Sequence, residues 1–141
     1  MRVSILRVPG IYAGDRLPLE RLRAGTPALC EAQDAYTNHI HADDLARAIV
    51  AALARGRTQR AYNTSDGSWL KMGAYFDLVA DRFGLPRPPR VTMAEAQGRV
   101  SEAMLSFMRE SRRLQNGRLQ RELRLRLRYP TVQTGIEAAA A

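Results

Sequence analysis

Three side chains that can bind a metal ion or exchange protons alternate along one short stretch of the sequence, namely His39, His41 and Asp43. On an extended segment, residues two apart point to the same side, so these three side chains would share one face, as metal ligands often do. The sequence has no other histidine, and Cys30 is its single cysteine. Because a fourth protein ligand is missing from the pattern, we predict no metal site.

A serine hydrolase triad would need a nucleophilic serine near one of these histidines. Ser65 and Ser68 follow His41 in the sequence, but neither stands in the G-x-S-x-G turn that presents such a nucleophile. We therefore predict no triad. Asp43 and Asp44 stand at the start of an apolar, helix-periodic stretch, where a carboxylate favours the free N–H groups of a helix, so we predict that they cap that helix.

A second concentration of chemistry is basic. Eight arginines stand against two glutamates between positions 109 and 128, and the net charge of the chain is +8. Such a segment can bind phosphate or nucleic acid, or it can be a solvated face that pairs with carboxylates elsewhere. Lys71 is the only lysine, which is the pattern that GC-rich codons produce, and no nucleic-acid-binding motif accompanies the arginines. We do not favour nucleic acid as a partner, and we keep a basic helical nucleic-acid-binding or protein-interaction module as the alternative function.

The elements that must position these residues can be read from apolar periodicity and from the glycines and prolines that end each pattern. Residues 3–8 and 60–64 are rich in β-branched or aromatic residues and predict strands. Apolar spacing predicts helices at 18–24, 43–55, 71–83, 92–109 and 116–123. Leucines and arginines alternate from 125 to 129, which predicts an exposed edge strand or an extended tail, and we expect residues 138–141 to be frayed.

This order of elements indicates an α/β fold. Two strands cannot form an independent parallel sheet of useful stability, because such sheets need more strands and helices on both faces. We therefore expect this chain to be part of something larger.

Four segments resemble, in order and spacing, the extended short-chain dehydrogenases/reductases, the NAD-dependent epimerase/dehydratase family. Arg7-Val-Pro-Gly-Ile-Tyr12 is similar to the family's Arg-x-Pro-x-x-Tyr segment, and Ile40-His-Ala-Asp-Asp-Leu-Ala46 to its Ile-His-Val-x-Asp-Leu-Ala. Tyr62-Asn-Thr-Ser-Asp-Gly67 is similar to its Tyr-Asn strand end. The arginine-marked stretch 111–123, followed by Tyr129-Pro130, is similar to its closing pattern, although the family has Leu-Gly where this chain has Leu-Arg.

The resemblance implies a fold and a reaction. Residues 1–67 would be late strands and helices of a Rossmann-type parallel sheet, the C-terminal part of an NAD(P)-binding domain, and residues 68–141 a mostly helical substrate-binding lobe. The intact protein would use NAD or NADP to transfer hydride at a carbinol or carbonyl carbon of a small or sugar-like substrate. The resemblance places Pro9, Gly10, Ile11 and Tyr12 beside the cofactor. It places Asn38, His39, His41 and Arg112 at the substrate.

Two motifs of the family do not occur in this sequence. No two glycines lie two or three positions apart, so the glycine-rich turn that brings a helix N-terminus to the cofactor pyrophosphate is absent. The residue four before Lys71 is Gly67, so the Tyr-x-x-x-Lys pair that moves the proton is absent as well. We predict no catalytic residue in this chain, and we expect it to bind cofactor poorly alone. A missing N-terminal Rossmann half, or a second copy in a homodimer, would be its partner.

The composition indicates a soluble protein of the cytoplasm. Apolar residues make up 45% of the chain and charged residues 26%, which is ordinary for a globular domain. Arg7 interrupts the short apolar stretch at the start, which makes a poor signal peptide, and the longest apolar run is too short to span a bilayer. We expect no membrane partner.

Overall fold

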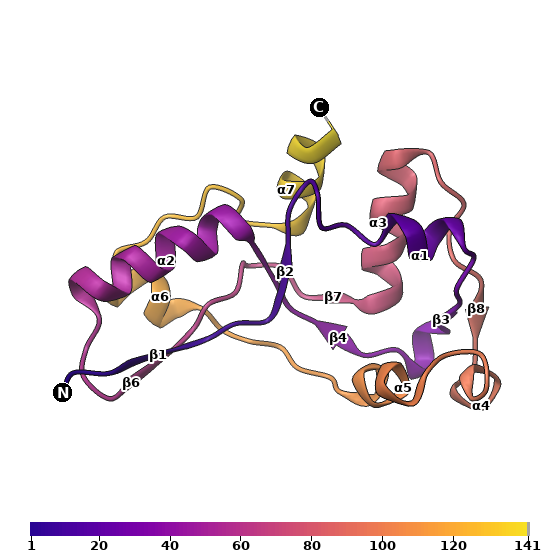
Figure 1. The fold of residues 1–141 in the computed structure, drawn as a ribbon, viewed down its shortest axis with the longest axis horizontal. Coiled ribbons are helices and arrows are strands. Elements are labelled where there is room, and N and C mark those ends of the chain that lie inside the picture. The colour runs from indigo at the N-terminus through magenta and orange to yellow at the C-terminus, as the bar shows by residue number, and fades with distance from the viewer. Residues whose placement is uncertain (141) are drawn as a thin grey trace.

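The computed structural model describes residues 1–140 and shows an elongated α/β molecule (Figure 1). The strands are β1 (Ser4–Arg7), β2 (Gly10–Tyr12), β3 (Ala28–Leu29), β4 (Tyr36–Thr37), β5 (His39–His41), β6 (Arg60–Asn63), β7 (Leu70–Lys71) and β8 (Arg90–Val91). The helices are α1 (Leu19–Arg23), α2 (Ala42–Arg55), α3 (Met72–Phe83), α4 (Met93–Ala96), α5 (Glu102–Arg109), α6 (Gly117–Glu122) and α7 (Val132–Ala140), with one 3-10 turn at Glu31–Gln33.

The strands form four separate pairs. β1 pairs with β6, β2 with β5 and β3 with β8, all in parallel, whereas β4 and β7 are antiparallel. The mixed α/β class predicted from the sequence is therefore confirmed, and so are the two strands that the sequence predicted, β1 and β6. The other strands were not predicted, because two or three residues are too few to show a period-2 pattern.

Apolar side chains gather in two clusters. One lies at the end that carries β1 and β6, where α2 and α6 cover the strand pair through Ala48, Tyr62 and Leu119, each fully buried (Figure 1). The other surrounds α3 and draws in side chains from α1, β3, β8, α5 and α7. Each cluster contains residues from both sides of position 67, and the predicted division of the chain at that position stays a prediction.

The apolar face of α2 is only partly buried. Helical spacing places Ile49 and Leu53 on the apolar face of α2 with Ala48, but Leu53 is 85% exposed and Ile49 is 46% exposed, whereas Ala48 is buried. On β1 the same holds for Ile5, which is 51% exposed, while its neighbour Leu6 packs under α2. Among the described residues β1 pairs only with β6, so its second edge is free. The same part of the chain thus has exposed apolar side chains and an unpaired strand edge.

Two helical predictions were wrong. The stretch predicted as one helix over 92–109 divides into α4 and α5, because Gly98 adopts a positive φ of 83° that a continuous right-handed helix does not allow. The capping box predicted at its start is present, with the Thr92 hydroxyl accepting from Glu95 N and the Glu95 carboxylate accepting from Thr92 N. The end of the chain, expected to fray from 138, is helical as far as Ala140, and residue 141 lies outside the described residues.

The stretch 125–129 forms no strand. Leu125 is 6% exposed and belongs to the cluster under α2, so it is not part of an exposed edge. The alternative prediction, an extended tail, is closer, although this tail is held by Asp44. The Asp44 carboxylate is fully buried and accepts from the backbone N–H groups of Arg128 and Tyr129 at 2.8 and 2.9 Å.

The start of α2 is capped by a histidine and not by the predicted aspartates. The Nδ1 atom of His41 accepts a hydrogen bond from Asp43 N at 3.0 Å, and α2 begins one residue earlier than predicted, at Ala42. Asp43 and Asp44 instead occupy the first turn, where their charges favour the positive helix end. Within residues 1–140, no helix combines the length and the apolar character that crossing a membrane requires.

Candidate functional site

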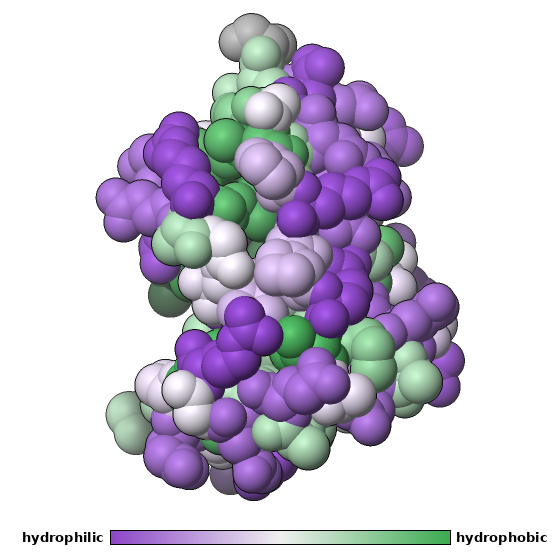
Figure 2. Space-filling view, turned by 90° about the vertical axis from the view of Figure 1, so that its right-hand side faces the viewer, coloured by the Kyte–Doolittle hydropathy of each residue, from purple (hydrophilic) through white to green (hydrophobic). Residues whose placement is uncertain are grey.

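A pocket of about 920 Å³ lies between the end of β1, α1, β4, β5, α3 and the segment after α5. Its wall combines backbone around positions 8–11 with aromatic and methionine side chains from α3 and α5. Figure 2 views the end of the molecule that carries α1 and α3, where hydrophilic residues dominate and apolar residues show between them. The pocket lining includes Pro9, Gly10, Ile11, Arg21, Asn38, His39, Met72, Tyr75, Phe76, Met104, Glu110 and Arg112.

The pocket brings together most of the residues predicted from the sequence. Three of those expected beside a cofactor, Pro9, Gly10 and Ile11, line it from one side. Three expected at the substrate, Asn38, His39 and Arg112, line it as well. Gly10 pairs with His39 across the parallel strands β2 and β5, which is why segments so far apart in sequence meet here.

His39 is the buried imidazole of this site. It is 7% exposed, and its ring lies 4.2 Å from the ring of Tyr75, centroid to centroid. Burial lowers the pKa of His39 to about 4, so the ring is neutral near pH 7. Its Nδ1 atom is buried without a hydrogen-bond partner among the described residues. The ring can therefore stack on a ligand or share a proton with it, but it does not supply a positive charge.

The amide of Asn38 makes two hydrogen bonds within the fold. Its Nδ2 donates to the carbonyl of Arg112 at 2.7 Å, and its Oδ1 accepts from Leu114 N at 2.9 Å. Both ends of the amide are thus used in holding the segment 112–114 against the pocket. Asn38 acts in this structure as a positioning residue for that wall.

Arg112 lines the pocket beside a carboxylate. Its side chain is 70% exposed, and its Nη2 lies 3.7 Å from the carboxylate of Glu110. The charge of Arg112 is therefore partly balanced and largely solvated, which weakens it as an anchor for an anion.

Tyr12 and His41 do not line the pocket. Tyr12 is 1% exposed, and its ring meets the ring of His41 edge-on at 5.2 Å. His41 caps α2 and lies 4.0 Å from the ring of Tyr129. His39, His41 and Asp43, which alternate in the sequence, therefore do not share one site. The described residues contain no cluster of three His, Cys, Asp or Glu side chains suited to a metal ion.

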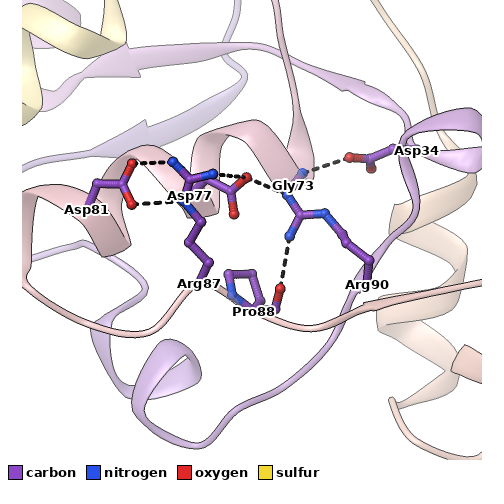
Figure 3. Close-up of polar contacts among 7 residues, drawn as sticks. All are labelled: Asp34, Gly73, Asp77, Asp81, Arg87, Pro88 and Arg90. Carbon is purple, nitrogen blue, oxygen red and sulfur yellow. Dashed lines mark hydrogen bonds and ion pairs between the residues drawn. The ribbon is translucent and has the colours of Figure 1, made fainter.

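The helix that carries the aromatic wall is held in place from behind. Asp77 accepts from Arg90 at 2.6 Å, and Asp81 pairs with Arg87 at 2.7 Å (Figure 3). Two carboxylates of α3 thus bind the proline-rich segment that joins α3 to β8 and the start of β8 itself. The backbone N–H of Gly73, in the first turn, donates to Asp34 at 2.7 Å. A Cβ at Gly73 would lie within 3.0 Å of the ends of the Asp34 and Arg90 side chains, so a larger residue there would have to move them.

Sequence reasoning missed two features of the pocket. Tyr75 and Phe76 belong to the apolar stripe of the helix predicted over 71–83, and they are buried, but they also form the pocket wall. Arg21, on the short helix α1, was not predicted as a site residue. A single arginine on an amphipathic helix is usually solvated, so the sequence does not distinguish it. Burial lowers the pKa of its guanidinium from the ordinary value, although the group lies within the wall of an open pocket.

A nicotinamide dinucleotide fits only part of this chain. Pro9, Gly10 and Ile11 offer backbone and a small apolar surface to a flat ring at the pocket edge. Among residues 1–140, however, no glycine-rich turn joins a strand to a helix in a way that would receive a pyrophosphate. We therefore assign no residue here to the cofactor's phosphates and derive no reaction step through it.

Comparison with known sequences gave no match. No protein-family model matches the chain, and neither does any curated protein sequence.

Comparison with solved structures gave many matches. A functionally unknown conserved protein from Silicibacter pomeroyi is 30% identical with a TM-score of 0.85, and the alignment covers 96% of this chain and 48% of that one. A putative NAD-dependent epimerase/dehydratase from Methylobacillus flagellatus is 27% identical with a TM-score of 0.63, over 96% and 45%. A human epimerase family protein, solved with NADPH, is 15% identical with a TM-score of 0.78, over 99% and 48%.

The chain spans about half the length of each of these structures, while nearly all of this chain is used in each match. The family resemblance found in the sequence is confirmed at this level. In structure, this chain matches about half of an NAD-dependent epimerase/dehydratase of the extended short-chain dehydrogenase/reductase family.

Proposed function

We propose that this chain is the substrate-binding part of an NAD(P)-dependent oxidoreductase or epimerase that acts on a small or sugar-like substrate with a carbinol or carbonyl carbon. The observation that carries the proposal is the pocket that joins Gly10 and Ile11 to His39 and the α3 wall. A nicotinamide ring at the first two residues would lie beside a substrate held by the others. The structural matches include a protein solved with NADPH, which supports the cofactor class.

The chain needs a second body for chemistry, since its described residues offer neither a pyrophosphate turn nor the Tyr-x-x-x-Lys pair. The free edge of β1 and the exposed side chains of Ile5, Ile49 and Leu53 support a place for it. A parallel strand added beside β1 would complete its free edge, and the exposed apolar side chains of α2 could pack on the added body. This body would be a Rossmann half, either in the same polypeptide or in a partner chain.

Reconstitution tests this function. The chain is co-expressed with the half of the Silicibacter pomeroyi protein that it does not cover, and the complex is tested for NADH and NADPH binding by fluorescence and by calorimetry. We expect the two parts to co-elute, the complex to bind a reduced dinucleotide, and the chain alone to give no heat. Binding of the dinucleotide by the chain alone with micromolar affinity would contradict the proposed division of labour.

A matched pair of variants makes the result specific. Ile5→Arg puts a charge on the apolar face beside the free strand edge and should prevent co-elution. Gln133→Arg adds the same side chain on the exposed side of α7 and should leave the complex intact. Equal loss in both variants would argue against β1 as the joining edge.

The basic segment supports the alternative function less well. Arg113 lies over the rings of Tyr36 and Trp69, and Arg118 donates to the carbonyl of Ala61, so part of this segment is used inside the molecule. A salt titration of binding to duplex DNA separates the two functions, because phosphate contacts by arginines give a steep salt dependence. We expect no binding at low salt.

A further inference from the structure

Arg21 is a cation in the pocket wall without a carboxylate to balance it. Its guanidinium lies over the ring of Phe76, 4.7 Å from the ring centre. Nη2 donates to the carbonyl of Pro27 at 2.9 Å, and Nη1 points to the thioether sulfur of Met104 at 3.5 Å, which is a weak acceptor. Its Nε is buried without a partner, and Arg21 forms no ion pair with any described residue.

This arrangement is costly unless something completes it. A guanidinium has five N–H donors, and here one carbonyl and one sulfur satisfy only part of them. A guanidinium that is partly withdrawn from water gains from an opposite charge, because its hydration is incomplete. By contrast, arginines outside the pocket do form ion pairs with the carboxylates of α3.

The charges around the pocket are mostly positive. Four arginines line it (Arg7, Arg16, Arg21 and Arg112) against the single carboxylate of Glu110, and that carboxylate already faces Arg112. His39 adds no charge near pH 7. The wall beyond Arg21 is apolar, with Met72, Tyr75 and Phe76 from α3. A ligand matched to this surface carries a negative group at one end and a compact apolar or flat body at the other.

We infer that Arg21, and not Arg112, anchors a negatively charged oxygen group of the substrate, so that the substrate of the proposed function is an acid, carrying a carboxylate or a phosphate. The inference rests on the proposed function, since the pocket is taken as the substrate pocket. Bidentate contact with such a group uses the planar guanidinium as lysine could not. The body of the substrate would then lie along the Phe76–Tyr75 wall toward His39.

Anion binding by the chain as it exists tests the inference without cofactor or partner. Inorganic phosphate and propionate are titrated at constant ionic strength, with 1-propanol as the neutral probe, while the imidazole signals of His39 are followed by NMR. We expect saturable shifts with at least one of the two anions and none with the alcohol. The tighter anion distinguishes a phosphoryl from a carboxylate substrate. Absence of saturation with both anions overturns the inference.

Variants locate the anchor. Arg21→Gln should weaken binding about tenfold or more, since a hydrogen bond to a charged group contributes roughly 1.5–3 kcal/mol. Arg21→Lys keeps the charge without the planar fork and should recover part of the affinity. Arg23→Gln removes an exposed arginine from the same helix and should bind as the wild type does. Equal affinity of Arg21→Gln and wild type overturns the assignment, as does a larger loss in Arg112→Gln.

A measurement on the unmodified protein covers the case in which Arg21→Gln does not fold. Phenylglyoxal reacts with accessible guanidinium groups, and the modified arginines are identified by mass spectrometry. We expect the bound anion to slow modification of Arg21 while Arg23 reacts at an unchanged rate. Equal rates for Arg21 with and without anion overturn the inference. Reconstitution with a Rossmann half can fail without affecting any of these readouts, so the two proposals fail separately.

Discussion

The ring of Tyr12 lies directly against Gly135, so that the end of strand β2 and the middle of helix α7 meet without a side chain between them. A Cβ built on Gly135 would overlap the hydroxyl group and the ring edge of Tyr12. The Tyr12 hydroxyl donates to the carbonyl of Thr131 at 3.4 Å, one turn earlier on the same side. This contact closes the core beside His39 and His41, whose rings Tyr12 meets edge-on, and thereby fixes the strand that presents Gly10 and Ile11 to the pocket.

Gly135→Ala should therefore destabilise the fold although alanine favours helices. The added methyl group has to displace a fully buried ring, and such overpacking costs about 2 kcal/mol or more. The free energy of unfolding from urea denaturation measures the loss. Because the ring of Tyr12 moves with β2, the His39 signals in the NMR spectrum should shift as well.

Gly14→Ala is the matched control for that variant. A Cβ at Gly14 meets only the Cβ of Ala139 at 3.7 Å, an ordinary contact, and Gly14 is exposed. Its free energy of unfolding should stay within about 0.5 kcal/mol of the wild type. If both variants lose the same stability, the close approach of Tyr12 to Gly135 is not the cause.

Asp44→Asn should be among the most destabilising single-atom exchanges in this chain. The fully buried carboxylate accepts from Arg47 Nη1, from Arg128 N and from Tyr129 N, all within 2.9 Å. An amide cannot accept all three bonds, and its NH₂ group would face a backbone N–H. Loss of a buried, charge-assisted network costs about 3 kcal/mol, which thermal and urea unfolding would detect.

The neighbouring carboxylate supplies the control. Asp43 is 55% exposed at its side chain, so water screens its charge. Asp43→Asn removes the same charge from the same helical turn and should change stability by less than about 1 kcal/mol. A comparable loss in the two variants would mean that charge at the start of α2, and not the tail contact of Asp44, is what matters.

The sequence predicted the long elements well because their signals were strong. The apolar period of α3 and the Gly84 that ends it, with a φ of 64°, identify that helix within one residue. The predicted apolar face of α2 is present, and two of its side chains, Ile49 and Leu53, are exposed. Periodicity shows which side chains share a face, but it does not show whether anything in the chain covers that face.

The pocket could be predicted only in part. Family resemblance brought Gly10, His39 and Arg112 to one place, and the parallel pairing of β2 with β5 puts the first two side by side. The resemblance did not reveal that the amide of Asn38 bonds to the segment 112–114, because these bonds depend on how a segment distant in sequence packs against Asn38. Arg21 was missed for the same reason, since only the packing of α1 on α3 decides that its guanidinium lies in a wall.

The buried imidazole of His39 predicts how stability changes with pH. Burial lowers its pKa from 6.5 to about 4, so the unfolded chain takes up a proton between those values and the folded chain does not. The stability that this group contributes is present above about pH 6.5 and is lost as the pH falls toward 4. The loss amounts to about 3 kcal/mol over that range.

Comparison with His39→Gln isolates this contribution. The difference in free energy of unfolding between wild type and variant should fall by that amount from neutral pH to about pH 4, measured by urea denaturation at each pH. A difference that does not change with pH would show that the imidazole is solvated, in conflict with its 7% exposure.

Asp66 predicts a pH dependence of opposite sign. It lies in the turn after β6, is 1% exposed, and has one carboxylate oxygen without a partner, while the other accepts from Ser68 N at 2.8 Å. Burial raises its pKa from 3.8 to about 6, so the folded chain holds a proton that the unfolded chain has already released. The stability from the neutral acid is full below about pH 3.8 and is lost as the pH rises through about 6.

Asp66→Asn removes this titration and keeps the carbonyl oxygen that faces Ser68. Relative to the wild type, the variant should gain about 3 kcal/mol between about pH 4 and pH 6 and show a constant difference above that range. Asp81→Asn is the control, because pairing with Arg87 lowers the pKa of Asp81 and gives a drift of the other sign. Since His39 and Asp66 act in opposite directions over the same range, the wild type alone would show little slope, and only the paired variants separate them. Parallel pH profiles for Asp66→Asn and wild type would show that the turn keeps this carboxylate hydrated, contrary to its burial.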